Sequence, residues 1–228
     1  MPFYLRPSAP TATDALICGD PARALTIAQH VMLQPRISNH NRGLWGYYGE
    51  TPAGRPLTVQ ATGIGAPSAA AVLSEASDLG RTRLVRVGTC AATGGDHPPL
   101  GGTVVVAAAR AGDGTSRALG AGEEATPDRS LTAALATASG AVTTKIASAD
   151  LLPSLGEHGG EGRPGLHDLQ TAAVFTLARR LSLAAAAGLV VRSVDGRPLE
   201  DEPLDAALLR LADAAVTALD KPGSQVEG

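Results

Sequence analysis

The residues that could do chemistry in this chain gather where short apolar segments run into glycine turns. The first turn is residues 18–24 (CGDPARA), where an apolar segment meets a glycine and then a proline suited to a first helical turn. Such a junction aims backbone N–H groups and the positive end of a helix at an anion. Arg23, one turn into this helix, would add a fork of donors to the same anion.

The second turn is residues 62–68 (TGIGAPS), between an apolar segment and a helical one. A dinucleotide-binding turn requires a third glycine and, about twenty positions on, an acidic residue for a ribose hydroxyl. Position 68 is a serine, and the later region carries Arg81, Arg83 and Arg86 instead. These departures argue against a nicotinamide dinucleotide.

Arg86 stands inside an apolar strand-like segment, where an unpaired guanidinium is costly. We expect it either to pair with a carboxylate or to face an anion at the carboxyl end of its strand. Thr89 follows in a glycine turn, at the edge where open α/β sheets bind ligands. The residues alone therefore predict an oxyanion site built from Gly19, Arg23, Arg86 and Thr89.

These residues need a scaffold, and the alternation of β-branched runs with Ala/Leu-rich stretches predicts an α/β fold. We expect strands over 15–18, 57–62, 84–87, 103–108, 142–147 and 189–192. We expect helices over 22–32, 67–79, 128–139, 168–181 and 204–219, with Asp128 and Asp168 as caps at helix starts. The Gly/Pro-rich stretch 153–164 is predicted to be an exposed surface loop, with a lid as the alternative.

Length and composition indicate a single globular domain over residues 1–220, with a flexible tail over 221–228. The chain has 228 residues, of which 44% are hydrophobic and 18% charged, close to the globular average. Its net charge of -3 argues against nucleic acid as a partner. No apolar run reaches the ~18 residues of a membrane span, so no membrane partner is expected.

The two cysteines and five histidines point to no metal chemistry. Cys18 and Cys90 lie in apolar surroundings, so two buried free thiols in a cytoplasmic protein are favoured over a disulfide. The start of the chain does not read as a signal peptide. The histidines lack metal-ligand spacing, and His167 is expected at the surface or near a helix cap.

Four motifs, in order, resemble the nucleoside phosphorylases of the purine and uridine phosphorylase superfamily. They are residues 19–24 (GDPARA), 41–43 (NRG) with Gly46, 63–68 (GIGAPS) and 86–90 (RVGTC). The resemblance covers about residues 3–219 and implies a three-layer α/β/α fold around a twisted mixed sheet. It also implies a homo-oligomer built from dimers, either a dimer or a trimer of dimers. The implied reaction is cleavage of a nucleoside by inorganic phosphate, the co-substrate, to a free base and a pentose 1-phosphate, with no other cofactor.

Carried over residue by residue, the resemblance gives phosphate-binding roles to Gly19, Arg23, Arg86 and Thr89. It has Arg42 reach the phosphate of an adjacent subunit. Tyr4 stands where many members carry a histidine lent to the neighbour's ribose 5′-hydroxyl, and a packing role for Tyr4 is an equal alternative. Arg86 would also serve catalysis, by stabilising charge as the glycosidic bond breaks.

The ribose and base half of the site departs from the family pattern. Leu169 and Gln170 replace a Met-Glu pair whose Glu grips the ribose hydroxyls, and Leu152 replaces the aromatic ring after a Ser-x-Asp segment. Ile64 is expected to line the same half. Purine-specific members end a strand with an Asp that protonates the departing base. Asp195 aligns with that catalytic acid in one alignment of this segment, whereas in the other alignment Asp195 belongs to the next turn.

Two hypotheses of different class follow. The first is a nucleoside phosphorylase, a pentosyltransferase acting on a purine or pyrimidine nucleoside. The second is a weakened or inactive paralogue that keeps phosphate binding and oligomer assembly and completes the site of an active partner through Arg42 and Tyr4. A nucleosidase that uses water is a third hypothesis, disfavoured because hydrolysis has no need of so many phosphate-facing arginines.

Overall fold

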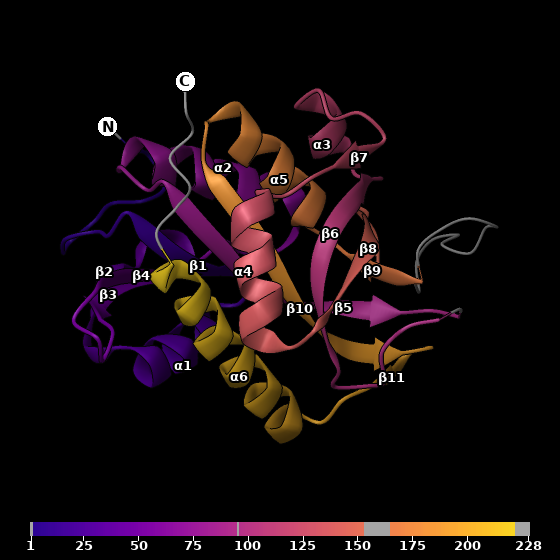
Figure 1. Cartoon of the computed structure of the whole chain (residues 1–228). Coiled ribbons are helices and arrows are strands. Elements are labelled where there is room, and N and C mark those ends of the chain that lie inside the picture. The colour runs from indigo at the N-terminus through magenta and orange to yellow at the C-terminus, as the bar shows by residue number, and fades with distance from the viewer. Residues whose placement is uncertain (1, 95, 153–164, 222–228) are drawn as a thin grey trace.

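One β-sheet runs through the molecule, and helices cover both of its faces (Figure 1). The computed structural model describes residues 2–94, 96–152 and 165–221, and in that part eleven strands form the sheet. Parallel and antiparallel pairs both occur, so the predicted three-layer α/β/α fold with a mixed sheet is confirmed.

The strands are numbered along the chain and lie in the order β11-β10-β6-β8-β9-β5-β1-β4-β3-β2, with β7 beside β6. Their bounds are β1 (Asp14–Cys18), β2 (Leu33–Asn39), β3 (Gly46–Glu50), β4 (Pro56–Ala61), β5 (Arg83–Ala92), β6 (Thr103–Ala111), β7 (Glu124–Ala125), β8 (Val142–Ser148), β9 (Leu166–Asp168), β10 (Ala184–Val194) and β11 (Arg197–Pro198).

The centre of the sheet is parallel: β5 pairs with β1 on one side and with β10 on the other. Their carboxyl ends therefore meet at one edge. Strand β10 also pairs with β6, and β9 pairs with both β8 and β5. Strands β5, β10, β6, β8 and β9 thus close into a ring, which brings β9 back to the carboxyl end of β5.

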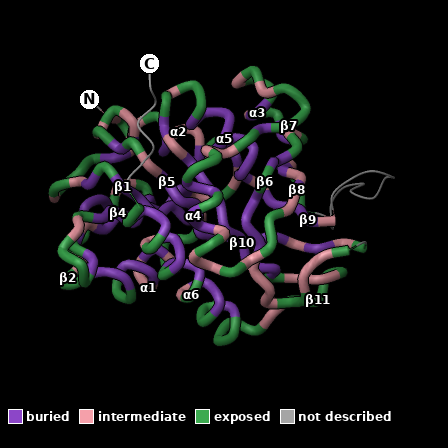
Figure 2. Tube along the Cα trace, viewed as in Figure 1, coloured by how far each residue is buried: buried purple, intermediate pink, exposed green. Residues whose placement is uncertain are grey.

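Two helical layers sandwich the sheet. Helices α1 (Pro21–Val31), α4 (Arg129–Ser139) and α6 (Asp201–Asp220) share one core, and α2 (Gly65–Asp78) and α5 (Thr171–Arg180) share the other. Two shorter helical segments are α3 (Gly114–Ala118) and the 3₁₀ turn η1 (Asn41–Gly43). The core is built chiefly from Ala, Val and Leu, and the buried tube in Figure 2 follows the central strands and the inner helix faces.

Three expectations for the elements were wrong in part. Strand β10 begins at Ala184, because the run AAAAG is buried in the sheet in spite of its helical propensity. The helix expected from Asp168 begins instead at Thr171, because residues 166–168 form β9. The sequence also missed the β2–β3 hairpin. The edge strand β2 is largely exposed and β3 is mostly buried, so neither shows a clean apolar alternation.

The remaining expectations stand as follows. Cys18 and Cys90 are buried free thiols, as predicted. The predicted loop at 153–164 and most of the predicted tail lie outside the described residues. Within the described ranges, no helix is both long and apolar enough to cross a membrane. The same part of the chain holds no group of three or more His, Cys, Asp or Glu side chains placed to hold a metal ion.

Candidate functional site

The first glycine turn connects β1 to α1 as the sequence predicted, but its helix is already capped. Gly19 follows β1, and the Asp20 carboxylate accepts hydrogen bonds from the N–H groups of Ala22 (2.8 Å) and Arg23 (3.4 Å). Two N–H groups that the sequence left free for an anion therefore have a partner. The guanidinium of Arg23 makes no hydrogen bond or ion pair within the described residues.

Arg86 lies at the centre of the site, in the buried middle of β5. Its Nη2 donates to Asp168 Oδ2 (3.0 Å), and the two side chains are 6% and 1% exposed. Its Nη1 donates to Gln170 Oε1 (2.7 Å), and its Nε to Thr171 Oγ1 (3.1 Å). Of the two expected fates of Arg86, the structure shows pairing with a carboxylate. A guanidinium has five N–H donors, so one on Nη1 and one on Nη2 stay available for a ligand.

Asp168 was expected only as a helix cap, and it does more. From the end of β9 it accepts bonds from Ser148 Oγ (2.6 Å) and from the N–H (3.0 Å) and Oγ1 (2.6 Å) of Thr171, besides pairing with Arg86. A buried arginine in a strand requires a carboxylate partner, so Arg86 was the signal that could have found this role. No local pattern says which carboxylate it is.

Gln170 joins both glycine turns to Arg86. Its side chain is buried, and its Nε2 donates to the carbonyl oxygens of Gly63 (2.6 Å) and Gly65 (3.1 Å). A Cβ placed on Gly19 would lie 3.4 Å from the Gly63 oxygen and 3.7 Å from Gln170 Oε1. The segments that the sequence singled out therefore converge on one place at the carboxyl edge of the sheet.

The electrostatics of this edge favour an anion. Burial is the main cause that lowers the pKa of Arg23. Cys18 and Asp20 act in the opposite direction, and the guanidinium groups of Arg86 and Arg192 lower the pKa further. Burial raises the pKa of the Cys18 thiol to about 11, so this group is neutral at physiological pH. Arg192, at the end of β10, is a candidate that the sequence reasoning did not single out.

Arg42 and Tyr4 lie together. Arg42 is exposed, and its Cζ is 5.5 Å from the centre of the Tyr4 ring. The Tyr4 N–H donates to Glu75 Oε2 (2.8 Å), and its carbonyl accepts from Asn41 Nδ2 (2.9 Å). Within the described residues, no hydrogen bond or ion pair joins Arg42 or Tyr4 to Arg86 or Gln170.

Comparisons with known proteins match this geometry to a family. The model of the phosphorylase superfamily matches residues 13–155. The chain belongs to this superfamily. A uridine phosphorylase of Treponema pallidum is 43% identical over 123 residues, which are 53% of this chain and 46% of the relative. A DeoD-type purine nucleoside phosphorylase of Oceanobacillus iheyensis is 40% identical over 82 residues, or 36% of this chain and 34% of the relative.

The matched segments thus span about half or less of the length of these relatives. Among solved structures, a uridine phosphorylase of Vibrio fischeri in complex with 6-hydroxy-1-naphthoic acid superposes with a TM-score of 0.77. The alignment covers 92% of this chain and 90% of that one at 24% identity, so it shows the shared phosphorylase fold.

The apolar residues predicted for the ribose and base half of the site are each at least partly exposed. Ile64, in the turn before α2, is 85% exposed, and Leu152, after β8, is 52% exposed. Leu169 is half-buried between β9 and α5. Thr89 is also partly exposed, opposite Val190 of β10, and its hydroxyl makes no hydrogen bond within the described residues.

Asp195 lies in the hairpin turn between β10 and β11. Asp195 and Gly196 both have positive φ angles, 46° and 78°, as a two-residue type I′ turn requires. The carboxylate accepts the N–H of Gly94 (3.1 Å). Of the two alignments with the family, the one that assigns Asp195 to the turn after the strand agrees with its position here. Its role as a catalytic acid stays a prediction.

His167 corrects another expectation. Its side chain is buried rather than at the surface, and its Nε2 lies 3.0 Å from Thr93 Oγ1. The reason is again β9, which draws residues 166–168 into the sheet.

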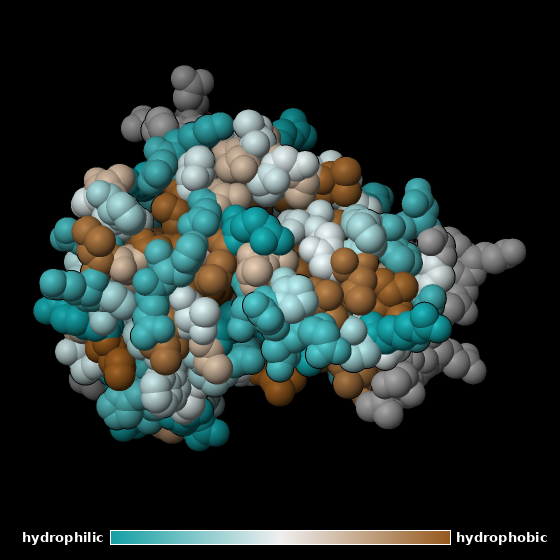
Figure 3. All heavy atoms as spheres, turned by 90° about the horizontal axis from the view of Figure 1, so that it is seen from below, coloured by the Kyte–Doolittle hydropathy of each residue, from teal (hydrophilic) through white to brown (hydrophobic). Residues whose placement is uncertain are grey.

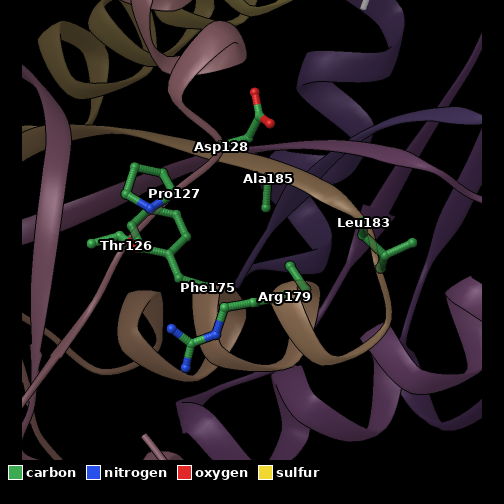
Figure 4. A pocket seen from close by; sticks show the side chains of 8 residues that line it. Thr126, Pro127, Asp128, Phe175, Arg179, Leu183 and Ala185 are labelled. Carbon is green, nitrogen blue, oxygen red and sulfur yellow. The ribbon is translucent and has the colours of Figure 1, made fainter. Parts of the chain in front are cut away.

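A separate hollow of about 190 Å³ lies at the amino end of β10, opposite the glycine turns, and is lined in part by Phe175, Leu183 and Ala185 (Figure 4). Its two charged lining residues, Asp128 and Arg179, point away from each other in Figure 4. We assign it no role.

Proposed function

We propose that this chain binds inorganic phosphate at the carboxyl ends of β1, β5 and β10 and uses it to cleave the N-glycosidic bond of a nucleoside. One observation carries the proposal. The buried guanidinium of Arg86 is fixed beside both glycine turns by Asp168 and Gln170 and keeps two free N–H donors. The guanidinium of Arg23 and the hydroxyl of Thr89, which have no hydrogen-bond partner within the described residues, stand at the same edge of the sheet.

In the proposed reaction phosphate attacks the sugar directly, so the protein forms no covalent bond to the substrate. A phosphate oxygen forms a bond to the anomeric carbon while the bond from that carbon to the base nitrogen breaks. The base leaves with the bonding electron pair and takes up a proton, and the products are a free base and a pentose 1-phosphate. Alignment of phosphate and charge stabilisation as the sugar becomes positive are the main contributions of the protein.

The residues around Arg86 act mainly by positioning it. Gln170 uses its amide on Gly63, Gly65 and Arg86, so its first role is to hold the turns and the guanidinium in place. An apolar wall of Ile64, Leu152 and Leu169 would meet the sugar and base. Such a wall buries surface without reading hydrogen bonds, which fits a relaxed choice between purine and pyrimidine.

The proposed assembly is a homo-oligomer in which Arg42 and Tyr4 complete a neighbouring site. The cation–π contact holds Arg42 against Tyr4, and the hydrogen bond from the Tyr4 N–H to Glu75 fixes the Tyr4 backbone. The same side of the sheet exposes Leu33 (58%) and Ile37 (46%) on the edge strand β2. Hydrophobic residues reach the surface in several further places on the face shown in Figure 3.

The test is release of free base from uridine, inosine and adenosine with and without phosphate, followed by chromatography. We expect release only when phosphate is present. Equal release without phosphate would show hydrolysis instead. Phosphate at a hundredfold excess over its Kd should also stabilise the fold by about 2.7 kcal/mol, seen as a rise in Tm.

Two variants localise that effect. Arg86→Ala should abolish the phosphate-dependent rise in Tm, whereas Arg129→Ala, an exposed residue at the start of α4, should keep it. A phosphate-dependent Tm with no nucleoside turned over would support the non-catalytic paralogue.

A further inference from the structure

The sheet order places two arginines, neither of them in an ion pair with another described residue, on either side of Thr89. Strand β5 lies between β1 and β10 in a parallel arrangement. Arg23 follows the carboxyl end of β1 in the first turn of α1, and Arg192 lies near the carboxyl end of β10. Thr89 pairs with Val190, so Arg192 lies just beyond it along the neighbouring strand.

A bulge in β10 sets Arg192 apart from its neighbours. Val191 pairs with Cys90 and Ser193 with Ala91, so Arg192 is the extra residue between two consecutive pairs. Bulges of this kind re-aim a side chain and are frequent next to active sites. The backbone is fixed there, because the carbonyl of Arg192 accepts the N–H of Leu199 (2.7 Å). The exposed side chain makes no hydrogen bond or ion pair within the described residues.

The charge of Arg86 is already compensated, so a further cation would strengthen the binding of an anion. Asp168 already compensates the charge of Arg86 through a 3.0 Å ion pair. Arg23 has Asp20 nearby, but that carboxylate bonds the backbone of the helix start rather than the guanidinium. The guanidinium of Arg192 is one of the causes that lower the pKa of Arg23, so the two groups lie within electrostatic reach of each other. Within the described residues neither Arg23 nor Arg192 makes an ion pair, so both guanidinium groups are available to an anion at this edge.

We propose that Arg192 is a phosphate-binding residue that acts jointly with Arg23, so that Arg192 supplies the positive charge which Asp168 removes from Arg86. This inference rests on the proposed function, because it deepens the account of the same anion site. It adds to the site a residue from β10, which none of the four glycine and arginine motifs contains.

The test measures the Kd of inorganic phosphate by calorimetry at about pH 8, where the dianion predominates. The variants are Arg192→Ala, Arg192→Lys and Arg197→Ala in the full chain. Arg197 is the matched control, because it is also an exposed arginine and lies on the other strand of the same hairpin, beyond the turn at Asp195. The loss of one charge-assisted contact should weaken binding about tenfold to hundredfold in Arg192→Ala. Arg192→Lys should fall between, and Arg197→Ala should match the unchanged chain.

A second measurement of the phosphate Kd, at ~0.5 M NaCl, separates direct contact of Arg192 with phosphate from a long-range electrostatic effect. Screening removes the effect of a distant charge at this salt concentration, so a loss that persists shows direct contact. If Arg192→Ala binds phosphate like Arg197→Ala, or if its defect vanishes at high salt, the inference is wrong while the proposed function stands. If the unchanged chain does not bind phosphate, the proposed function fails.

Discussion

Strand β5 carries two arginines three positions apart, and their surroundings differ in one respect. Arg83, near the amino end of the sheet, bonds both carboxylate oxygens of Asp14, which also pairs with Arg55 (2.8 Å). Arg55 in turn pairs with Asp220 of α6 (2.7 Å). Arg83 donates further to the carbonyl oxygens at the end of α6. Two arginines and two aspartates therefore balance at this end.

The carboxyl end is not balanced. Arg86 has one carboxylate, Asp168, while Arg23 and Arg192 have no ion pair within the described residues. At both ends an arginine of β5 pairs with an aspartate of another strand. At the amino end Arg81, just before β5, is also buried, and its Nε and Nη1 have no hydrogen-bond partner within the described residues. What sets the carboxyl end apart is that its further arginines lie beside the glycine turns. A buried arginine alone therefore does not mark a binding site, whereas several arginines that converge on backbone turns at the carboxyl edge of a sheet are a stronger indication.

The largest effect is expected from Asp168→Asn, which removes the carboxylate beside Arg86. This change leaves the buried Arg86 without its counter-charge, so the free energy of unfolding should fall by about 3–5 kcal/mol. The freed guanidinium should at the same time bind phosphate more tightly. Urea unfolding and phosphate calorimetry measure the two effects. Glu123→Gln, which removes an exposed carboxylate, is the control and should change neither. Weaker phosphate binding in Asp168→Asn would contradict the charge account.

A smaller effect is expected at the balanced end from Asp14→Ala. Arg83 and Arg55 lose their shared carboxylate, but their side chains are 19% and 35% exposed, so water screens the remaining charges. The free energy of unfolding should fall by about 2–3 kcal/mol, less than the loss of a fully buried partner. The Kd of phosphate should stay unchanged. If it changes as much as in Asp168→Asn, the two ends do not differ in the way described.

The smallest effect is expected from Asp195→Asn. Asn-Gly is a favoured type I′ turn, so the hairpin and its bond from Gly94 should persist. The rate of base release should then fall far less than the ~10²–10⁴-fold typical when a general acid is lost. A loss in that range would show that Asp195 is the acid and that its turn moves when substrate binds.

Local patterns in the sequence predicted much of this arrangement. Both glycine turns, Arg86 inside its strand and the helix cap at Asp128 depend on residues a few positions apart, where spacing is informative. The cap at Asp20 was missed. The same reasoning failed at β9 and at the start of β10. Three residues give too short a pattern for a strand, and the run AAAA is helical by propensity but strand by burial.

The sequence by itself determined the α/β class, the buried thiols and the presence of an unusual arginine in a core strand. Only the tertiary structure decided which groups surround that arginine. Asp168 and Gln170 lie 82 and 84 positions from Arg86 in the chain. They reach it because the ring of strands brings β9 beside β5. The charge balance of a site depends on such distant contacts, and no local spacing in a sequence records them.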